Sequence, residues 1–134
     1  MLISSKSTYA LRAIAYMAKN NGDKQYICIS GIASNLNISR KYLESIMTQL
    51  AKNGLIDVCK GKCGGYRLNR SPKEYTFYDI LIVTEEELKT CSCCCVGKNE
   101  SCKEEDNCSV LCTYNELHDL INNFFKNKTI QDII

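Results

Sequence analysis

Cysteine is the most conspicuous chemical feature of this chain, because seven of its ten cysteines lie within residues 91–112. The residues between them are mostly polar or charged, so this segment cannot bury an apolar core of its own. A thiol-rich polar loop therefore needs a ligand or a cross-link to become ordered. Isolated cysteines are often inert core residues, which is our interpretation of Cys28 and Cys59. The clustered residues are Cys91, Cys93, Cys94, Cys95, Cys102, Cys108 and Cys112.

Metal binding is the chemistry that this cluster favours. The chain opens into a predicted helix without a recognisable export signal, so we expect a cytoplasmic protein whose thiols stay reduced. Reduced thiols do not form lasting disulfides and are free to act as ligands. Tetrahedral Zn²⁺ would accept four thiolates, whereas an iron–sulfur cluster would accept three or four. The residues alone leave both cofactors open.

A helix-turn-helix is predicted ahead of the cysteine cluster. Residues 39–50 place apolar side chains at helical spacing and polar side chains on the opposite face. Ser39 is a suitable N-cap, and Gly54 suits a left-handed C-terminal position. A shorter helix over residues 31–36, capped by Ser30, precedes it across a tight turn. The apolar stripe of the second helix consists of Leu43, Ile46, Met47 and Leu50.

A β-hairpin follows and makes the prediction more specific. Residues 55–59 and 66–68 have the composition of short strands, and the glycines between them, Gly61 and the pair at 64–65, permit φ > 0 and a tight turn. On its own, a glycine pair is typical of any hairpin. Because this hairpin directly follows a polar-faced helix and carries Lys60 and Lys62, we interpret it as the wing of a winged helix.

Two more helices are predicted around this unit. The first begins at Ser5 or Ser7 and ends near Lys19, and the other begins after Thr76, which is a suitable N-cap. The acidic residues 85–87 are interpreted as the solvated end of that later helix.

A long C-terminal helix carries a regular apolar stripe. The stripe could pack against the N-terminal domain of the same chain. Its width and its regular repeat instead favour packing against a partner helix in a homodimer. The stripe consists of Val110, Tyr114, Leu117, Ile121 and Phe124. The predicted fold class is mainly α with a small two-stranded β wing: a winged helix-turn-helix plus a long C-terminal dimerisation helix.

Charge divides the chain into two parts. Residues 1–83 contain 12 basic and 5 acidic residues, a balance of +7, and residues 84–134 contain 5 and 10, a balance of −5. This asymmetry suits a DNA-binding domain at 1–83 joined to a sensor loop and dimerisation helix at 84–134. No apolar run approaches the ~18 residues of a membrane span, so we expect no membrane partner.

An enzyme is disfavoured. The Cys91-x-x-Cys94 spacing could suggest a thiol redox catalyst, but no thioredoxin-like βαβ pattern surrounds it. The sequence also lacks a nucleotide-binding loop and an acid–base constellation, so we predict no catalytic residues.

These motifs together resemble the IscR/NsrR/CymR family of winged-helix transcription regulators over nearly the whole chain. Residues 4–13 (SSKSTYALRA) are similar to the family's opening helix, and residues 39–44 (SRKYLE) to its recognition helix. Residues 53–56 (NGLI) and 60–68 (KGKCGGYRL) are similar to its wing. The resemblance implies a homodimer on double-stranded operator DNA and, in the cluster-binding branch, an iron–sulfur cluster held by loop cysteines.

The resemblance also implies particular cluster ligands. Cys102 and Cys108 have the spacing of the second and third cysteines of the cluster-binding branch. The first cysteine corresponds most nearly to Cys95, with Cys94 and Cys93 as alternatives. The cluster would be of the 2Fe-2S or the 4Fe-4S type.

The fourth ligand departs from the pattern of the family. IscR has a histidine three residues after its third cysteine, where this chain has Leu111, and NsrR uses an aspartate where this chain has Thr8. Cys112 follows Leu111 and is our predicted fourth ligand. His118, the only histidine, is predicted to be a surface residue.

On the DNA side, the resemblance assigns base reading to residues of the second helix and a minor-groove contact to the wing. The family's wing arginine is Lys60 here, which lacks the guanidinium fork. Glu44 can accept a hydrogen bond from cytosine but repels phosphate. The predicted DNA-binding residues are Ser39, Arg40, Lys41, Tyr42, Glu44, Lys60 and Lys62.

The resulting hypothesis is a homodimeric regulator in which loss or oxidation of the cluster reorders the loop and shifts the recognition helices. A zinc-dependent or thiol-redox regulator on the same scaffold is the alternative, favoured by the surplus cysteines at 91–95. A rigid zinc staple without sensing is also compatible with the sequence.

Overall fold

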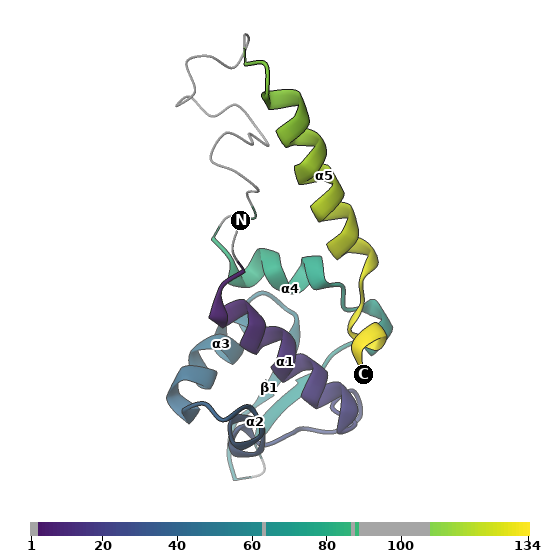
Figure 1. Cartoon of the computed structure of the whole chain (residues 1–134). Helices are drawn as coiled ribbons and strands as arrows, with labels where there is room; N and C mark the ends of the chain where they lie inside the picture. The colour runs from purple at the N-terminus through teal and green to yellow at the C-terminus, as the bar shows by residue number, and fades with distance from the viewer. Residues whose placement is uncertain (1–2, 63, 87, 89–107) are drawn as a thin grey trace.

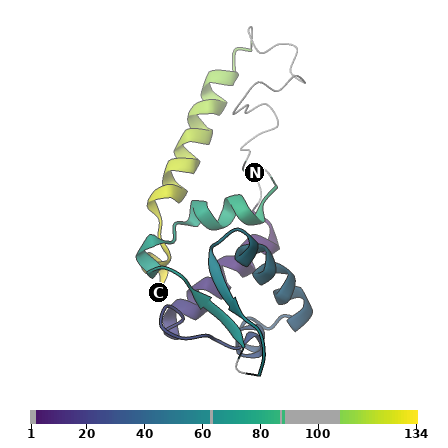
Figure 2. The same ribbon diagram turned by 180° about the vertical axis from the view of Figure 1, so that it is seen from behind.

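The computed structural model describes residues 3–62, 64–86, 88 and 108–134. A small winged helix is followed by a projecting C-terminal helix (Figures 1 and 2). In chain order the elements are α1 Ser5–Lys19, α2 Ile29–Leu36, α3 Arg40–Lys52, β1 Ile56–Cys59, β2 Gly65–Leu68, the 3-10 helix η1 Pro72–Glu74, α4 Phe77–Thr84, α5 Leu111–Asn127 and the 3-10 helix η3 Ile130–Ile133. The predicted fold class, mainly α with a small two-stranded β wing and a long C-terminal helix, is confirmed, and the role of that helix in dimerisation stays a prediction. Within the described ranges, no helix is both long and apolar enough to cross a membrane.

The helix-turn-helix forms as predicted except at the start of α2. This helix begins at Ile29 with Cys28 in the N-cap position, and no side chain caps it. The predicted cap by Ser30 is therefore wrong. Ile29 is buried, so the apolar face of α2 begins earlier than the predicted helix. Ser39 does cap α3, because its hydroxyl accepts a hydrogen bond from the Tyr42 amide at 3.1 Å.

The wing is an antiparallel hairpin in which Cys59 lies opposite Gly65. On the other side of β2, Ile27 and Tyr66 exchange two backbone hydrogen bonds, at 2.8 and 2.9 Å. Gly65 lies so close to this segment that any Cβ atom there would overlap the Ile27 carbonyl. Close backbone approach thus requires glycine at position 65, which lies in β2 and not in the turn, whereas Gly61 between the strands has the positive φ of 117°.

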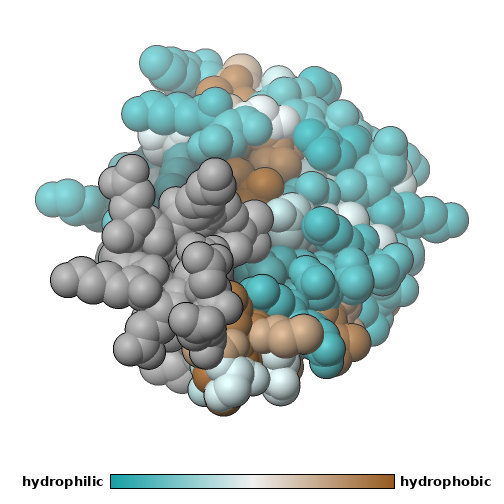
Figure 3. All heavy atoms as spheres, turned by 90° about the horizontal axis from the view of Figure 1, so that it is seen from above, coloured by the Kyte–Doolittle hydropathy of each residue, from teal (hydrophilic) through white to brown (hydrophobic). Residues whose placement is uncertain are grey.

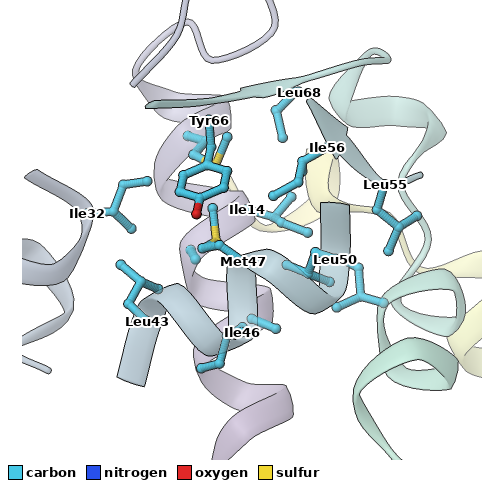
Figure 4. Close-up of a cluster of buried hydrophobic side chains, with 14 of the residues drawn as sticks. Ile14, Ile32, Leu43, Ile46, Met47, Leu50, Leu55, Ile56, Tyr66 and Leu68 are labelled. Atoms are coloured by element: carbon cyan, nitrogen blue, oxygen red, sulfur yellow. The ribbon is translucent and has the colours of Figure 1, made fainter. Parts of the chain in front are cut away.

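The apolar stripe of α3 lies at the centre of the core (Figure 4). It packs against α1, α2 and the hairpin, which fixes the orientation of the polar face of α3. Tyr75, just after the wing, is also fully buried, and its hydroxyl donates to the Leu55 carbonyl at 2.6 Å. The fully buried residues of α3 are Leu43, Ile46, Met47 and Leu50.

The C-terminal residues return to the winged helix. Thr76 and Asp79 form a capping box at the start of α4, as predicted. The ring of Phe77 stacks on Phe125 of α5 with centroids 6.5 Å apart. After α5 the chain folds back, and Ile130 is fully buried in the same core. Between these anchors and the loop, α5 extends away from the winged helix (Figure 1).

The apolar stripe of α5 is exposed in the single chain except at the half-buried Ile121, and Leu120 beside the stripe is exposed as well. Leu120 is 68% exposed and Phe124 is 60% exposed, and Val110, Tyr114 and Leu117 are exposed as well. Apolar surface is also visible between hydrophilic side chains from above, at the loop end (Figure 3). Large apolar side chains exposed together along one helix are typical of interaction sites in soluble proteins.

Candidate nucleic-acid interface and thiol loop

A groove of about 860 Å³ lies between α3 and the wing. The stripe of α3 is turned into the core, so the opposite, polar face forms one wall of the groove. Lys60 and Lys62 of the wing lie on the other wall. The groove is therefore lined by cations on both sides. From α3 its wall includes Arg40, Glu44, Thr48 and Lys52.

All seven residues predicted to bind DNA are exposed at the surface. The structure brings four of them together in the groove, namely those at positions 40, 44, 60 and 62. Lys41 and Tyr42 lie outside its lining, and the hydroxyl of Ser39 is already engaged in capping α3. The arrangement can bind a nucleic-acid backbone, whose phosphates would lie across the N-terminal half of α3.

Two contacts orient the start of α3. Arg40 Nε lies 3.2 Å from Glu44 Oε1, one helical turn further on. The ring of Tyr42 meets Tyr9 of α1 edge to face, with centroids 6.0 Å apart, and the guanidinium of Arg12 lies over Tyr9 at 5.6 Å. Tyr42 thus packs α3 against α1.

Two cysteines also line the groove, which the sequence did not predict. Cys28 and Cys59 are both exposed, so their interpretation as core residues is wrong. Cys28 precedes the buried face of α2, and Cys59 ends a strand that leaves the core. The pKa of the Cys28 thiol is lowered, first by hydrogen bonding to the Ser30 hydroxyl, 3.0 Å away, and to its backbone amide. The sequence did contain a signal for this activated thiol, because a serine two residues after a cysteine at the start of a helix can hydrogen-bond to the sulfur.

The predicted metal ligands fall only partly within the described residues. Cys95 and Cys102 lie outside them. Cys108 is half-buried just before α5, and Cys112 is exposed in its first turn, with Sγ 3.8 Å from Glu116 Oε1. Across the described ranges, no three side chains of the metal-ligating types gather in one place. Two thiols four residues apart in the sequence, at the start of α5, nevertheless fit the donor set of an iron–sulfur cluster or zinc, with the loop supplying the others.

His118 is buried, with only 6% of its surface exposed, so its prediction as a surface residue is wrong. Its Nε2 lies 2.8 Å from the side-chain amide nitrogen of Asn122. The amide donates to this ring nitrogen, which occupies the Nε2 lone pair that a metal would need.

The end of α4, where the chain enters the thiol loop, is tied to two other helices. Glu85 Oε1 accepts from the Ser4 amide at 2.8 Å and from Ser7 Oγ at 2.6 Å. The carbonyl of Val83 accepts from the side-chain amide of Gln49 on α3. The expectation of a solvated helix end is therefore wrong for Glu85. These contacts span the chain, so no local sequence pattern revealed them.

The ionisation of Glu85 follows from these contacts. Burial opposes the charged form of its carboxyl group. Hydrogen bonds from Ser7 and Ser4 outweigh that effect, so the pKa of Glu85 lies below its ordinary value.

Comparison with known proteins gives a consistent result. A family model described as "Rrf2: Iron-dependent Transcriptional regulator" matches residues 3–134. The chain is 28% identical to the HTH-type transcriptional regulator IscR of Pectobacterium atrosepticum, covering all of this chain and 79% of that protein. CymR of B. subtilis, described as its global cysteine regulator, superposes with a TM-score of 0.75 at 25% identity, covering 99% and 95% of the two chains. T. potens IscR superposes with a TM-score of 0.71 at 23% identity, covering 99% and 85%.

Proposed function

This chain belongs to the Rrf2 family of transcriptional regulators, and on that premise we propose that it is a homodimeric, sequence-specific DNA-binding regulator with an iron–sulfur sensor. Its matched relatives are transcriptional regulators and not enzymes. The observation that carries the proposal is the groove between α3 and the wing, which joins the polar face of a recognition helix to Lys60 and Lys62. We propose that this regulator acts in the cytoplasm.

DNA would enter along the exposed face of α3. A helix of this size fits the major groove, where side chains at its N-terminal end reach base edges. The wing lysines then lie against the backbone or the adjacent minor groove. Lysine contributes charge there without the planar fork of arginine, so it favours affinity more than sequence selection.

The homodimer would form through α5. Its apolar stripe repeats at helical spacing along most of the helix, and the most exposed apolar side chains are Phe124 of the stripe and Leu120 beside it. Two such stripes packed together would remove this apolar surface from water, which favours association. A twofold pair of recognition helices can read half-sites about one DNA turn apart. The division into a DNA-binding part, 1–83, and a sensing and pairing part, 84–134, follows from this arrangement.

The cluster would be held by Cys95, Cys102, Cys108 and Cys112, with Cys93 or Cys94 as alternatives to Cys95. When bound, it would supply a centre that is sensitive to oxidants. Cys108 and Cys112 support the proposal because they stand at the junction of the loop and α5.

The residues at the end of α4 could transmit a change in the loop to the DNA-binding face. A rearrangement of the loop would displace Glu85 and Val83, which accept hydrogen bonds from α1 and α3. A hydrogen bond to a charged group contributes about 1.5–3 kcal/mol. An allosteric coupling is typically about 1–3 kcal/mol, so breaking one such bond is sufficient to bias the recognition helix.

A zinc-dependent or thiol-redox regulator is the second candidate. The exposed Cys28, with its lowered pKa, favours it, together with the surplus cysteines of the loop.

The deciding experiment is purification without oxygen, followed by visible absorbance and by iron, sulfide and zinc analysis. Iron with matching sulfide and visible absorbance is the expected result. Zinc alone would favour the second candidate, and absence of both metals would favour thiol chemistry. The DNA interface is tested separately by binding to DNA over a range of salt. Affinity should fall on a log–log slope of about −0.9 per phosphate contact, and salt-independent binding would contradict the interface.

A further inference from the structure

Two cysteines of the groove lie on either side of Gly65, which is paired with Cys59 across the wing hairpin. On the other side of β2, Tyr66 is bridged to Ile27. The next opposed pair along this antiparallel ladder is therefore Gly65 with Cys28. In agreement with this register, a Cβ atom on Gly65 would lie only 3.1 Å from the backbone nitrogen of Cys28. Both thiols are exposed and line the groove, and glycine places no side chain between them.

The separation of the two cysteines suits a bridging ion better than a disulfide. Opposed residues on neighbouring strands have Cα atoms roughly 5 Å apart, so two such steps separate Cys28 from Cys59 by roughly 10 Å. A disulfide requires Cα atoms within about 7 Å of each other. An ion bound by both thiolates replaces one S–S bond by two metal–sulfur bonds of about 2.3 Å each, which extends the span between Cα atoms to roughly 9–10 Å.

The donor set and the charge of the groove select the kind of ion. Thiolates favour soft ions such as Cu(I), whereas structural zinc requires four ligands, and no group of three metal-ligating side chains is present among the described residues. A Cu(I) ion held by two thiolates carries one net negative charge. The cations that line the groove outnumber the carboxylate of Glu44 and would stabilise such a complex. These cations are Arg40, Lys52, Lys60 and Lys62.

The surroundings of Cys28 favour the form of the thiol that binds metals. Its Sγ lies 3.0 Å from Ser30 Oγ, a hydroxyl that can donate to it. Cys28 also occupies the N-cap position of α2, where the helix dipole stabilises negative charge. Both contacts favour the thiolate, which is the ligand that a metal ion requires.

We propose that Cys28 and Cys59 form a two-thiolate site for a soft monovalent ion of the Cu(I) class, and that its occupation blocks the DNA-binding groove. The anionic complex would repel phosphates and fill space between α3 and the wing that the DNA backbone requires. The metal site itself does not depend on the proposed function, whereas its effect on DNA rests on that function.

The site is tested by alkylating the full-length protein with iodoacetamide, without oxygen, in the presence and absence of buffered Cu(I). Peptide mass spectrometry measures the labelling rate of each cysteine separately, so that ions bound by the loop thiols do not obscure the result. The variants are Cys28→Ser and Cys59→Ser, and Mg²⁺, which prefers oxygen ligands, is the control ion.

We expect Cu(I) to slow the labelling of both cysteines in the wild type roughly tenfold, when its free concentration is about ten times its dissociation constant. In each variant the remaining groove thiol should lose this protection, because one thiolate cannot form the bridge. Protection of Cys28 that persists in Cys59→Ser would overturn the site. Equal labelling with and without Cu(I), or equal protection by Mg²⁺, would overturn it too.

The effect on DNA is measured by fluorescence anisotropy, with a site selected from a random DNA library. The same Cu(I) concentration should raise the dissociation constant for DNA roughly tenfold in the wild type, and should change it little in either variant. An increase of equal size in Cys28→Ser would show that copper acts through the loop, which would overturn the blocking of the groove. Failure of the metal-free protein to bind any DNA would overturn the proposed function, while the alkylation result would still decide the metal site.

Discussion

The hydroxyl of Ser7, near the start of α1, donates to the carboxylate of Glu85, directly after α4, across 2.6 Å. Ser7 is fully buried, and its oxygen also lies 2.6 Å from Thr84 Oγ1. Since each hydroxyl carries one proton and Ser7 donates its proton to Glu85, the contact with Ser7 uses the Thr84 proton, which Thr84 shares with the Ile80 carbonyl at 3.0 Å. The two ends of the DNA-binding part are joined by this chain of hydrogen bonds at the entrance to the thiol loop.

Replacing Ser7 by alanine should lower the free energy of unfolding by about 1.5–3 kcal/mol, because Glu85 loses a donor to its charged group. Urea denaturation followed by circular dichroism measures this change. Ser5→Ala is the matched control, since Ser5 is exposed on the same helix and should change stability little. Equal effects of both substitutions would contradict the role of the Ser7–Glu85 bond.

The same contact predicts a dependence of stability on pH. The folded-state pKa of Glu85 is lowered, so its carboxylate stabilises the fold above the ordinary carboxyl pKa of about 4.3. This contribution is lost as pH falls through the folded-state value. The difference in unfolding free energy between wild type and Glu85→Gln should therefore shrink between about pH 5 and pH 3. A difference that stays constant across this range would exclude Glu85 as the titrating group.

Gly65→Ala should destabilise the wing, because the added methyl group would overlap the Ile27 carbonyl. Overpacking of this kind costs about 1–3 kcal/mol, which thermal denaturation can measure. Gly31→Ala supplies the contrast. Its Cβ would come no closer than 3.9 Å to another group, so alanine within α2 should stabilise by about 0.5–1 kcal/mol. If both variants destabilised the protein equally, overlap with the Ile27 carbonyl would not explain the effect of Gly65→Ala.

Leu120→Glu should weaken the proposed dimer, raising its dissociation constant roughly 100-fold as an apolar anchor is lost from the interface. Sedimentation equilibrium over a range of protein concentrations measures this constant. Asn115→Glu adds the same charge at an exposed position off the stripe and should leave the dimer intact. A monomeric wild type would contradict the pairing role of α5 outright.

Replacing Cys102 and Cys108 by alanine should abolish iron and sulfide binding after anaerobic purification and change operator affinity. Cys28→Ser, outside the loop, should retain full iron content. Iron content is measured chemically, and affinity by fluorescence anisotropy with labelled DNA. Loss of iron with unchanged operator affinity would separate the cluster from the control of DNA binding.

Local patterns in the chain were enough to predict the elements. The spacing of Leu43, Ile46, Met47 and Leu50 identified α3 and its buried face, because side chains three and four apart share one side of a helix. Ser39, Gly54 and Thr76 marked helix ends because capping depends on backbone groups within one turn. Strand composition and the glycine pair located the wing in the same way.

What the tertiary structure alone decided depends on contacts between distant residues. Ser7 and Glu85 are 78 positions apart, and Gln49 and Val83 are 34 apart, so no local period links them. The burial of His118 and the exposure of Cys28 and Cys59 likewise depend on which elements pack beside them. Residue type fixes what a side chain can do chemically, but only the packing of helices determines whether it faces water, a groove or another helix.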